Sequence, residues 1–148
     1  CAWRSDRVNE MLFARENGEA YEKYLADKSA VKIPVVYSYR LPTEAEWNEI
    51  ARAEYPKKVL RKKCPLGNLK TESTDDQTIL TAPVNSYFAN TMGVYNLLGN
   101  VAEMTQDKGK AKGGRWQHTD DQSKADQTQN YTGPNSWLGF RCVCEITQ

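Results

Sequence analysis

The sequence lacks net charge, long apolar runs and internal repeats. Its 20 Lys and Arg residues are balanced by 19 Asp and Glu residues, so no net field directs the protein to nucleic acid or to an acidic surface. No apolar stretch approaches the roughly 18 residues that a membrane-spanning helix needs. The length of 148 residues suits one domain. We therefore expect a single folded domain over residues 1–148, with no role in nucleic-acid binding.

Aliphatic side chains are also scarce. Leu, Ile, Val and Phe account for 26 of the 148 residues, below the roughly 20% at which disorder becomes a concern. Disorder also requires a high net charge, which is absent here, and four Trp with eight Tyr supply bulky groups for burial. The composition predicts a folded domain with a thin core, of the kind that depends on disulfides or a bound metal.

The four cysteines are Cys1, Cys64, Cys142 and Cys144. Four cysteines allow three pairings, and their spacing does not choose between them. Cys142 and Cys144 are unsuited to each other, because in a strand their Cα atoms lie about 6.5–7 Å apart with parallel Cβ vectors. Reduced, buried cysteines remain an alternative. A zinc site that joins Cys64, Cys142 and Cys144 to His118 is another alternative, but the sequence has no Cys-x-x-Cys spacing.

The N-terminal segments have helical and then extended patterns. Residues 1–17 predict an amphipathic helix with Met11 on its apolar face and Asn9 pointing away. Residues 19–26 predict a second, shorter helix, and residues 31–39 predict a strand or an extended connection.

The strongest local signal lies at Arg40–Trp47. Thr43 is a predicted N-cap, and Glu46, three residues later, can complete a capping box. Trp47 then begins a buried stripe, and Pro56 ends the helix.

Later segments are less regular. Residues 57–80 are basic at first and then polar, without interleaved aromatic residues, which favours a solvated loop over a nucleic-acid patch. Residues 110–116 predict a short strand, and residues 137–146 predict one closing strand. Residues 117–136 are polar and too long for an ordinary loop, so they predict a functional or mobile surface.

Four motifs occur in an informative order. They are Tyr39-Arg40-Leu41-Pro42-Thr43-Glu44-Ala45-Glu46-Trp47, Tyr95-Asn96-Leu97-Leu98-Gly99-Asn100-Val101-Ala102-Glu103, Lys112-Gly113-Gly114-Arg115-Trp116 and Leu138-Gly139-Phe140-Arg141-Cys142-Val143. Together they resemble the formylglycine-generating enzyme (sulfatase-modifying factor) family. The resemblance implies an α+β fold, a C-type-lectin-like variant low in regular secondary structure. Because family domains are longer at the N-terminus, residues 1–148 correspond to the C-terminal portion of such a domain.

The resemblance also bears on catalysis. Family enzymes oxidise a cysteine of a client sulfatase with copper held by two cysteines that follow the Gly-Gly motif. In this sequence those positions fall on His118 and Ser123, and an imidazole with a hydroxyl does not replace two soft thiolates. Related sulfoxide synthases use three histidines, whereas His118 is the only histidine here. The expectation is a non-catalytic member, with His118 as a surface residue.

Two calcium sites are implied by the resemblance. The first comprises Asn96 and Glu103 side chains with the carbonyls of Gly99 and Val101, all of them hard oxygen ligands that suit Ca²⁺. The alternative for Glu103 is a capping role toward nearby backbone N–H groups. A second, looser site comprises Asn68, the carbonyl of Leu69, Asp76 and the carbonyl of Thr78.

The resemblance pairs Cys1 with Cys142 in a disulfide, which leaves Cys64 and Cys144 to pair or to stay free. Cys1 has a second interpretation, because the first residue of a mature lipoprotein is a lipid-bearing cysteine. We prefer the helix cysteine, since residues 1–10 correspond to a core helix of the family.

Within the family, residues 1–10 and 37–42 look most like the gliding-motility lipoproteins of the type IX secretion apparatus. This likeness implies a scaffold that binds protein partners at the periplasmic face of the outer membrane, held to the membrane only through a lipid anchor outside this chain. Trp116, His118 and Tyr131 form the expected ligand or partner surface. The alternatives are a lectin-like module that uses residues 117–136 and a residual formylglycine-generating oxidase.

Overall fold

The protein is described by a computed structural model that covers residues 1–29, 37–61, 65–70 and 81–147. The structure is α+β, as expected, with short helices and small sheets. Its chain divides into two compact units, which are described separately. The first unit comprises Cys1–Leu41 and Cys142–Gln148, and the second comprises Pro42–Arg141. Among the described residues, no helix combines the length and hydropathy that crossing a bilayer requires.

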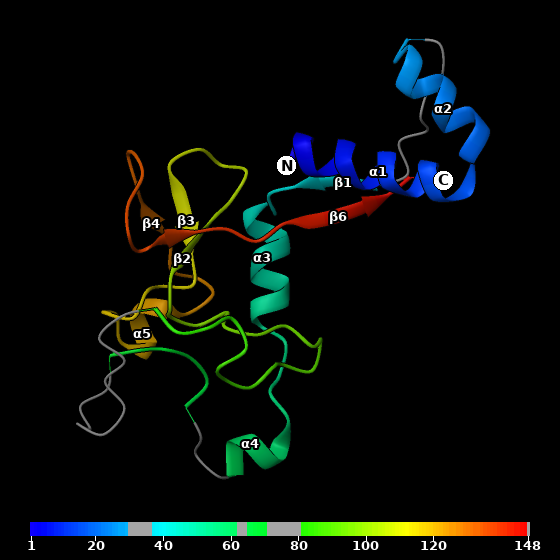
Figure 1. The fold of residues 1–148 in the computed structure, drawn as a ribbon. Helices are drawn as coiled ribbons and strands as arrows, with labels where there is room; N and C mark the ends of the chain where they lie inside the picture. The colour runs from blue at the N-terminus through cyan, green and yellow to red at the C-terminus, as the bar shows by residue number, and fades with distance from the viewer. Residues whose placement is uncertain (30–36, 62–64, 71–80, 148) are drawn as a thin grey trace. The chain divides into compact units, whose positions relative to one another are not determined.

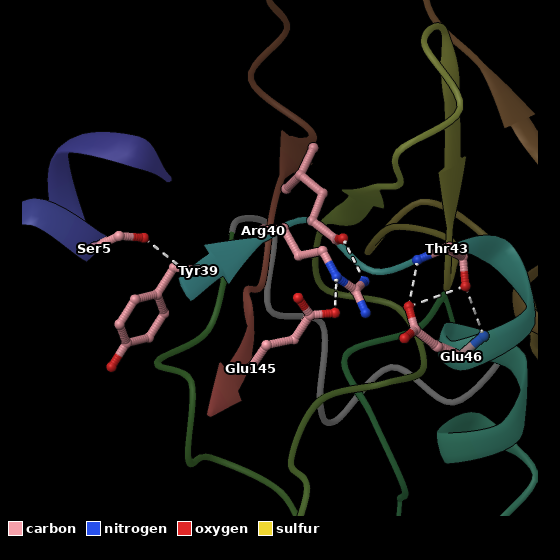
Figure 2. Close-up of polar contacts among 7 residues, drawn as sticks. Ser5, Tyr39, Arg40, Thr43, Glu46 and Glu145 are labelled. Carbon is pink, nitrogen blue, oxygen red and sulfur yellow. Dashed lines mark hydrogen bonds and ion pairs between the residues drawn. The ribbon is translucent and has the colours of Figure 1, made fainter. Parts of the chain in front are cut away.

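The first unit packs helices against a two-stranded sheet. Its elements are α1 (Ala2–Glu16), α2 (Gly18–Ala26), β1 (Tyr37–Arg40) and β6 (Val143–Ile146). β1 and β6 are antiparallel, and α1 runs beside them (Figure 1). An ion pair joins Arg40 Nε to Glu145 Oε1 at 2.6 Å across the sheet (Figure 2).

The buried face of α1 is polar, which corrects the predicted orientation of this helix. Asn9 is buried, and its amide donates to the Tyr37 carbonyl at 2.9 Å while accepting from the Tyr37 N–H at 3.0 Å. Ser5 Oγ accepts from the Tyr39 N–H at 2.8 Å (Figure 2). Met11, predicted to face the core, is 64% exposed. The backbone of β1 needs hydrogen-bond partners on the side away from β6, and polar side chains of α1 supply them.

The described part of the second unit contains a mixed sheet and three helices. Its helices are α3 (Glu44–Ala51), α4 (Lys57–Arg61) and α5 (Asp120–Ser123), and its strands are β2 (Ala102–Met104), β3 (Lys110–Lys112), β4 (Gln129–Asn130) and β5 (Leu138–Gly139). The strand order is β4-β3-β2-β5. β3 is antiparallel to both β2 and β4, whereas β5 is parallel to β2.

The predicted capping box of α3 is confirmed. Thr43 Oγ1 accepts from the Glu46 N–H at 3.2 Å, and the Glu46 carboxylate accepts from the Thr43 N–H at 2.8 Å (Figure 2). Trp47 follows on the inner face and is 1% exposed. It is part of a small core with Leu97 and the alanines of β2 and β3.

The single closing strand predicted for residues 137–146 is wrong. The segment forms two short strands, β5 in the second unit and β6 in the first. Phe140, which follows β5, is 63% exposed. Between the strands, Arg141 bonds to the Glu103 carboxylate and to two backbone carbonyls, and these contacts replace the alternating pattern of a strand.

Candidate metal and partner-binding sites

The predicted first calcium site lies at a cavity of about 440 Å³ in the second unit. Asn96, Val101 and Glu103 line this cavity together with Arg141. Gly99, the fourth predicted ligand, is not among the lining residues, although it is buried in the same segment. The structure therefore brings three of the four predicted ligands to one space.

Glu103 is buried on β2 and is held by two donors. Its Oε2 accepts from Trp47 Nε1 at 2.8 Å and from Arg141 Nε at 2.5 Å, and its Oε1 accepts from Arg141 Nη2 at 2.5 Å. Within the described ranges, the donors to Glu103 are side chains, and no backbone N–H bonds to it as the alternative prediction required. A carboxylate offers about four lone-pair sites, so one on Oε1 remains available.

Asn96, which lines the same cavity as Glu103, has an unpaired side-chain oxygen among the described residues. Its Nδ2 donates to the Pro83 carbonyl at 3.0 Å. Since a carbonyl can only accept, the amide orientation is fixed and Oδ1 faces away from Pro83. Oδ1 is buried and has no hydrogen-bond partner among the described residues. A buried acceptor without a donor is costly, and a cation would compensate that cost.

The loop that carries these residues is shaped by left-handed backbone at three positions. Asn96, Gly99 and Asn100 have φ values of 49°, 73° and 63°. A side chain at Gly99 would collide with the Asn68 carbonyl, 2.0 Å from the position of a Cβ atom. Gly99 also donates to the Gly113 carbonyl at 2.6 Å, so the loop is fixed from both sides.

The second predicted calcium site is only partly described. Asn68 is buried, forms a parallel bridge with Gly99, and donates through Nδ2 to Asn100 Oδ1 at 3.3 Å. Leu69 is half-buried next to it. Asp76 and Thr78 lie outside the described residues. This site stays a prediction.

The chemistry of the first site fits a hard cation. An amide oxygen, a carboxylate with a lone pair to spare and a nearby backbone segment are the oxygen ligands that Ca²⁺ takes. The carboxylate would be shared with the Arg141 guanidinium, which limits the negative charge left for the ion. Within the described ranges, no group of three or more His, Cys, Asp or Glu side chains is gathered as a metal cluster. A cation held here would therefore depend mostly on uncharged oxygens.

The copper-ligand positions do not fit copper. Ser123 is fully buried, and its Oγ donates to the Thr119 carbonyl at 3.0 Å. Gly114 packs against it so closely that a Cβ atom there would lie 2.0 Å from Ser123 Oγ. The hydroxyl is thus engaged in packing α5 onto the Gly-Gly turn, and it is a hard oxygen where copper needs a soft thiolate.

His118 is half-buried rather than at the surface. Its Nδ1 is shielded and has no partner in the described part of the chain. Burial, and then the charge of Arg115, lower the pKa of His118 below its ordinary value of 6.5. The imidazole is therefore neutral at neutral pH.

The expected partner surface is a set of half-buried side chains on anchored backbone. Trp116 N–H donates to the Asn100 carbonyl at 3.1 Å, and Tyr131 N–H donates to the Gly109 carbonyl at 2.9 Å. Trp116, His118 and Tyr131 are all partly exposed. Residues 117–136, predicted to be irregular, include α5 and β4.

Sequence reasoning missed two arginines of this unit. Arg141 holds Glu103 at the cavity, and Arg115 lies over the Trp137 ring with its guanidinium carbon 4.6 Å from the ring centroid. Both arginines occur inside the recognised motifs. The spacing of the motifs does not indicate that Arg141 binds Glu103, which is 38 residues away in the chain.

The cysteines predicted to pair lie next to each other in the first unit. The sulfur atoms of Cys1 and Cys142 are 3.6 Å apart, as free thiols. Cys144 is exposed and also free, and Cys64 lies outside the described residues. The positions suit the predicted disulfide, which itself stays a prediction.

Comparison with known protein families gives one match. The model of the sulfatase-modifying factor enzyme 1-like domain, named FGE-sulfatase, matches residues 1–146. The solved structure of CarF is 28% identical, with a TM-score of 0.56, over 74% of this chain and 48% of CarF. Among the curated proteins, the comparison found no match.

Two further solved structures share the fold. Treponema denticola variable protein 1 is 22% identical, with a TM-score of 0.54, over 74% of this chain and 48% of its own. PvdO from Pseudomonas aeruginosa is 21% identical, with a TM-score of 0.55, over 86% of this chain and 58% of its own. This chain thus spans about half the length of the solved structures that it matches.

Proposed function

Because the chain belongs to the sulfatase-modifying factor enzyme 1-like domain family, we propose that it is a non-catalytic, calcium-stabilised domain that binds protein partners. In this proposal both compact units belong to the one family domain of residues 1–148. The observation that carries the proposal is the state of the two copper positions. Ser123 is buried and hydrogen-bonded, and His118 is a single neutral imidazole.

A direct assay tests the loss of catalysis. The full chain, supplied with copper and oxygen, is incubated with a cysteine-containing sulfatase peptide, and formylglycine is measured by mass spectrometry. We expect no conversion, because two thiolates are missing. A sulfatase-modifying enzyme of the same family serves as the positive control. Conversion above the rate without protein would contradict the proposal and would revive the oxidase alternative.

Calcium binding is the second part of the proposal, and it is supported by the unpaired Asn96 Oδ1 and the adjacent Glu103 carboxylate. A bound ligand stabilises the native state by about 2.7 kcal/mol at a hundredfold excess over Kd. For a chain of this size that corresponds to roughly 5–11 °C in melting temperature. We expect a chelator to lower the melting temperature of the native protein by about this number of degrees. Asn96→Ala should melt at the same temperature with and without chelator.

The proposal of calcium binding is contradicted if the native protein has the same melting temperature in excess calcium and in excess chelator. Asn130→Ala is the matched control, because Asn130 is an exposed asparagine on β4. This control should keep the full response to calcium.

The last part of the proposal concerns the cellular process and the location in which the protein acts. The likeness of residues 1–10 and 37–42 to gliding-motility lipoproteins supports a role in type IX secretion or gliding, at the periplasmic face of the outer membrane, with a lipid anchor outside this chain. Crosslinking in envelope membranes should recover one stoichiometric protein partner. Trp116→Ala combined with Tyr131→Ala should abolish that recovery. A chain that recovers no stoichiometric partner would contradict the binding role.

A further inference from the structure

The guanidinium of Arg115 is held against Trp137 and forms no ion pair with an acid among the described residues. Its carbon lies 4.6 Å from the centroid of the Trp137 ring, in stacking geometry. Its Nε is buried without a hydrogen-bond partner, and no described carboxylate forms an ion pair with it. Buried N–H donors are almost always paired in folded proteins, so an unpaired one indicates a missing acceptor.

The backbone beneath Arg115 is rigid. The preceding Gly114 has a φ of 75° and packs directly on Ser123. Trp116 N–H donates to the Asn100 carbonyl, and His118 N–H donates to the Arg115 carbonyl at 2.8 Å. Stacking on Trp137 further restricts the side chain. A donor held in this way loses little conformational entropy when an acceptor binds.

A second unpaired polar atom belongs to His118, which is three residues after Arg115 in the same turn and donates its backbone N–H to the Arg115 carbonyl at 2.8 Å. His118 Nδ1 is buried and has no partner among the described residues. Asp121, on the neighbouring helix in the sequence, α5, is bound to Lys124 Nζ at 2.6 Å and forms no recorded ion pair with Arg115 in the described part of the chain. Two independent side chains therefore leave unsatisfied polar atoms in one part of the second unit.

We propose that Arg115, stacked on Trp137 beside His118, binds a carboxylate of the protein partner. This inference rests on the proposed partner-binding function and names the chemistry that the partner must present. A carboxylate accepts two parallel N–H bonds from one guanidinium, which is the geometry that Arg offers. One guanidinium with a neutral imidazole carries a single positive charge, which matches a carboxylate better than a phosphate dianion.

The test uses the full chain and two capped tripeptides that differ only in a central glutamate or glutamine. The Arg115 Nε–H resonance is followed by nitrogen–proton NMR as each peptide is added. We expect this resonance to shift with the glutamate peptide and to stay in place with the glutamine peptide. Arg115→Gln should weaken binding of the glutamate peptide by about tenfold or more, because it removes a charge-assisted, bidentate contact.

Two variants separate a specific site from a general charge effect. Arg15→Gln removes an exposed arginine of α1 and should leave binding unchanged. Arg115→Lys keeps the charge without the planar fork and should bind several-fold more weakly than the native protein. Equal response to both peptides, no response to either, or equal binding by Arg115→Gln would overturn the proposal. Tighter binding of inorganic phosphate than of acetate would also overturn the choice of a carboxylate.

The envelope crosslinking experiment distinguishes this inference from the broader function. If Arg115→Gln recovers the same partner as the native chain, the carboxylate site is wrong and the partner-binding function stands. If the glutamate peptide binds at Arg115 but no partner is recovered, the site stands and the proposed function is wrong.

Discussion

The contact between Arg141 and Glu103 gives the sharpest test of how this thin core is held together. Glu103 is buried, and its carboxylate accepts two hydrogen bonds from Arg141, at 2.5 Å each. Arg141 also donates to the carbonyls of Tyr95 and Asn96, at 3.2 and 3.4 Å. Arg141→Met therefore leaves a buried carboxylate without its countercharge. Breaking a buried pair in this way costs about 3–5 kcal/mol.

The assay is urea unfolding followed by Trp fluorescence, analysed as a double-mutant cycle with Glu103→Gln. The glutamine keeps an acceptor for Trp47 but removes the buried charge, so the double variant should be more stable than Arg141→Met alone. We expect a coupling energy of about 2 kcal/mol or more. Arg7→Met removes an exposed ion pair with Glu10 and should change stability by about 0.5 kcal/mol or less.

The same variants also test the calcium proposal, when their stability is measured both in calcium and in chelator. A cation at Asn96 and Glu103 would supply part of the missing positive charge, so Arg141→Met should lose more stability in chelator than in calcium. The reasoning is refuted if Arg141→Met costs under about 1 kcal/mol, or if its effect simply adds to that of Glu103→Gln.

Further predictions concern single side chains. Asn9→Leu should cost roughly 1–3 kcal/mol in urea unfolding, because Tyr37 loses both backbone partners; an unchanged midpoint would contradict the polar docking of α1. Gly114→Ala should destabilise the protein by more than about 1 kcal/mol, since φ is 75° and the new Cβ meets Ser123; a neutral effect would mean that the turn is misplaced. His118→Gln should flatten the fall in stability as pH drops below about 6.5: the folded-state pKa is lowered, so the unfolded state binds the proton first and is favoured by acid. A pH profile identical to that of the native protein would refute this role.

Some expectations could be read from local sequence because their causes are local. The capping box needs only Thr43 and Glu46 at the right spacing, and both of its hydrogen bonds are present. The family motifs likewise predicted which residues would gather at the cavity, and three of the four did.

Other features depended on contacts between distant segments. Residues 137–146 alternate like one strand, but Arg141 bonds to Glu103 from a different strand and the segment divides. Asn9 is a polar residue of the kind that usually faces solvent on a helix, yet its side chain bonds to the backbone of β1. Hydrophobic periodicity within one segment does not show that the backbone of another segment needs hydrogen-bond partners.

The amino-acid sequence by itself determined the family, the α3 cap and the absence of thiols at positions 118 and 123, because each is a matter of residue type at a fixed spacing. Tertiary structure alone decided which polar atoms remain unpaired. Asn96 Oδ1 and Arg115 Nε differ from ordinary surface groups only through what surrounds them. Burial removes water as a partner, and folding determines whether any protein group takes its place.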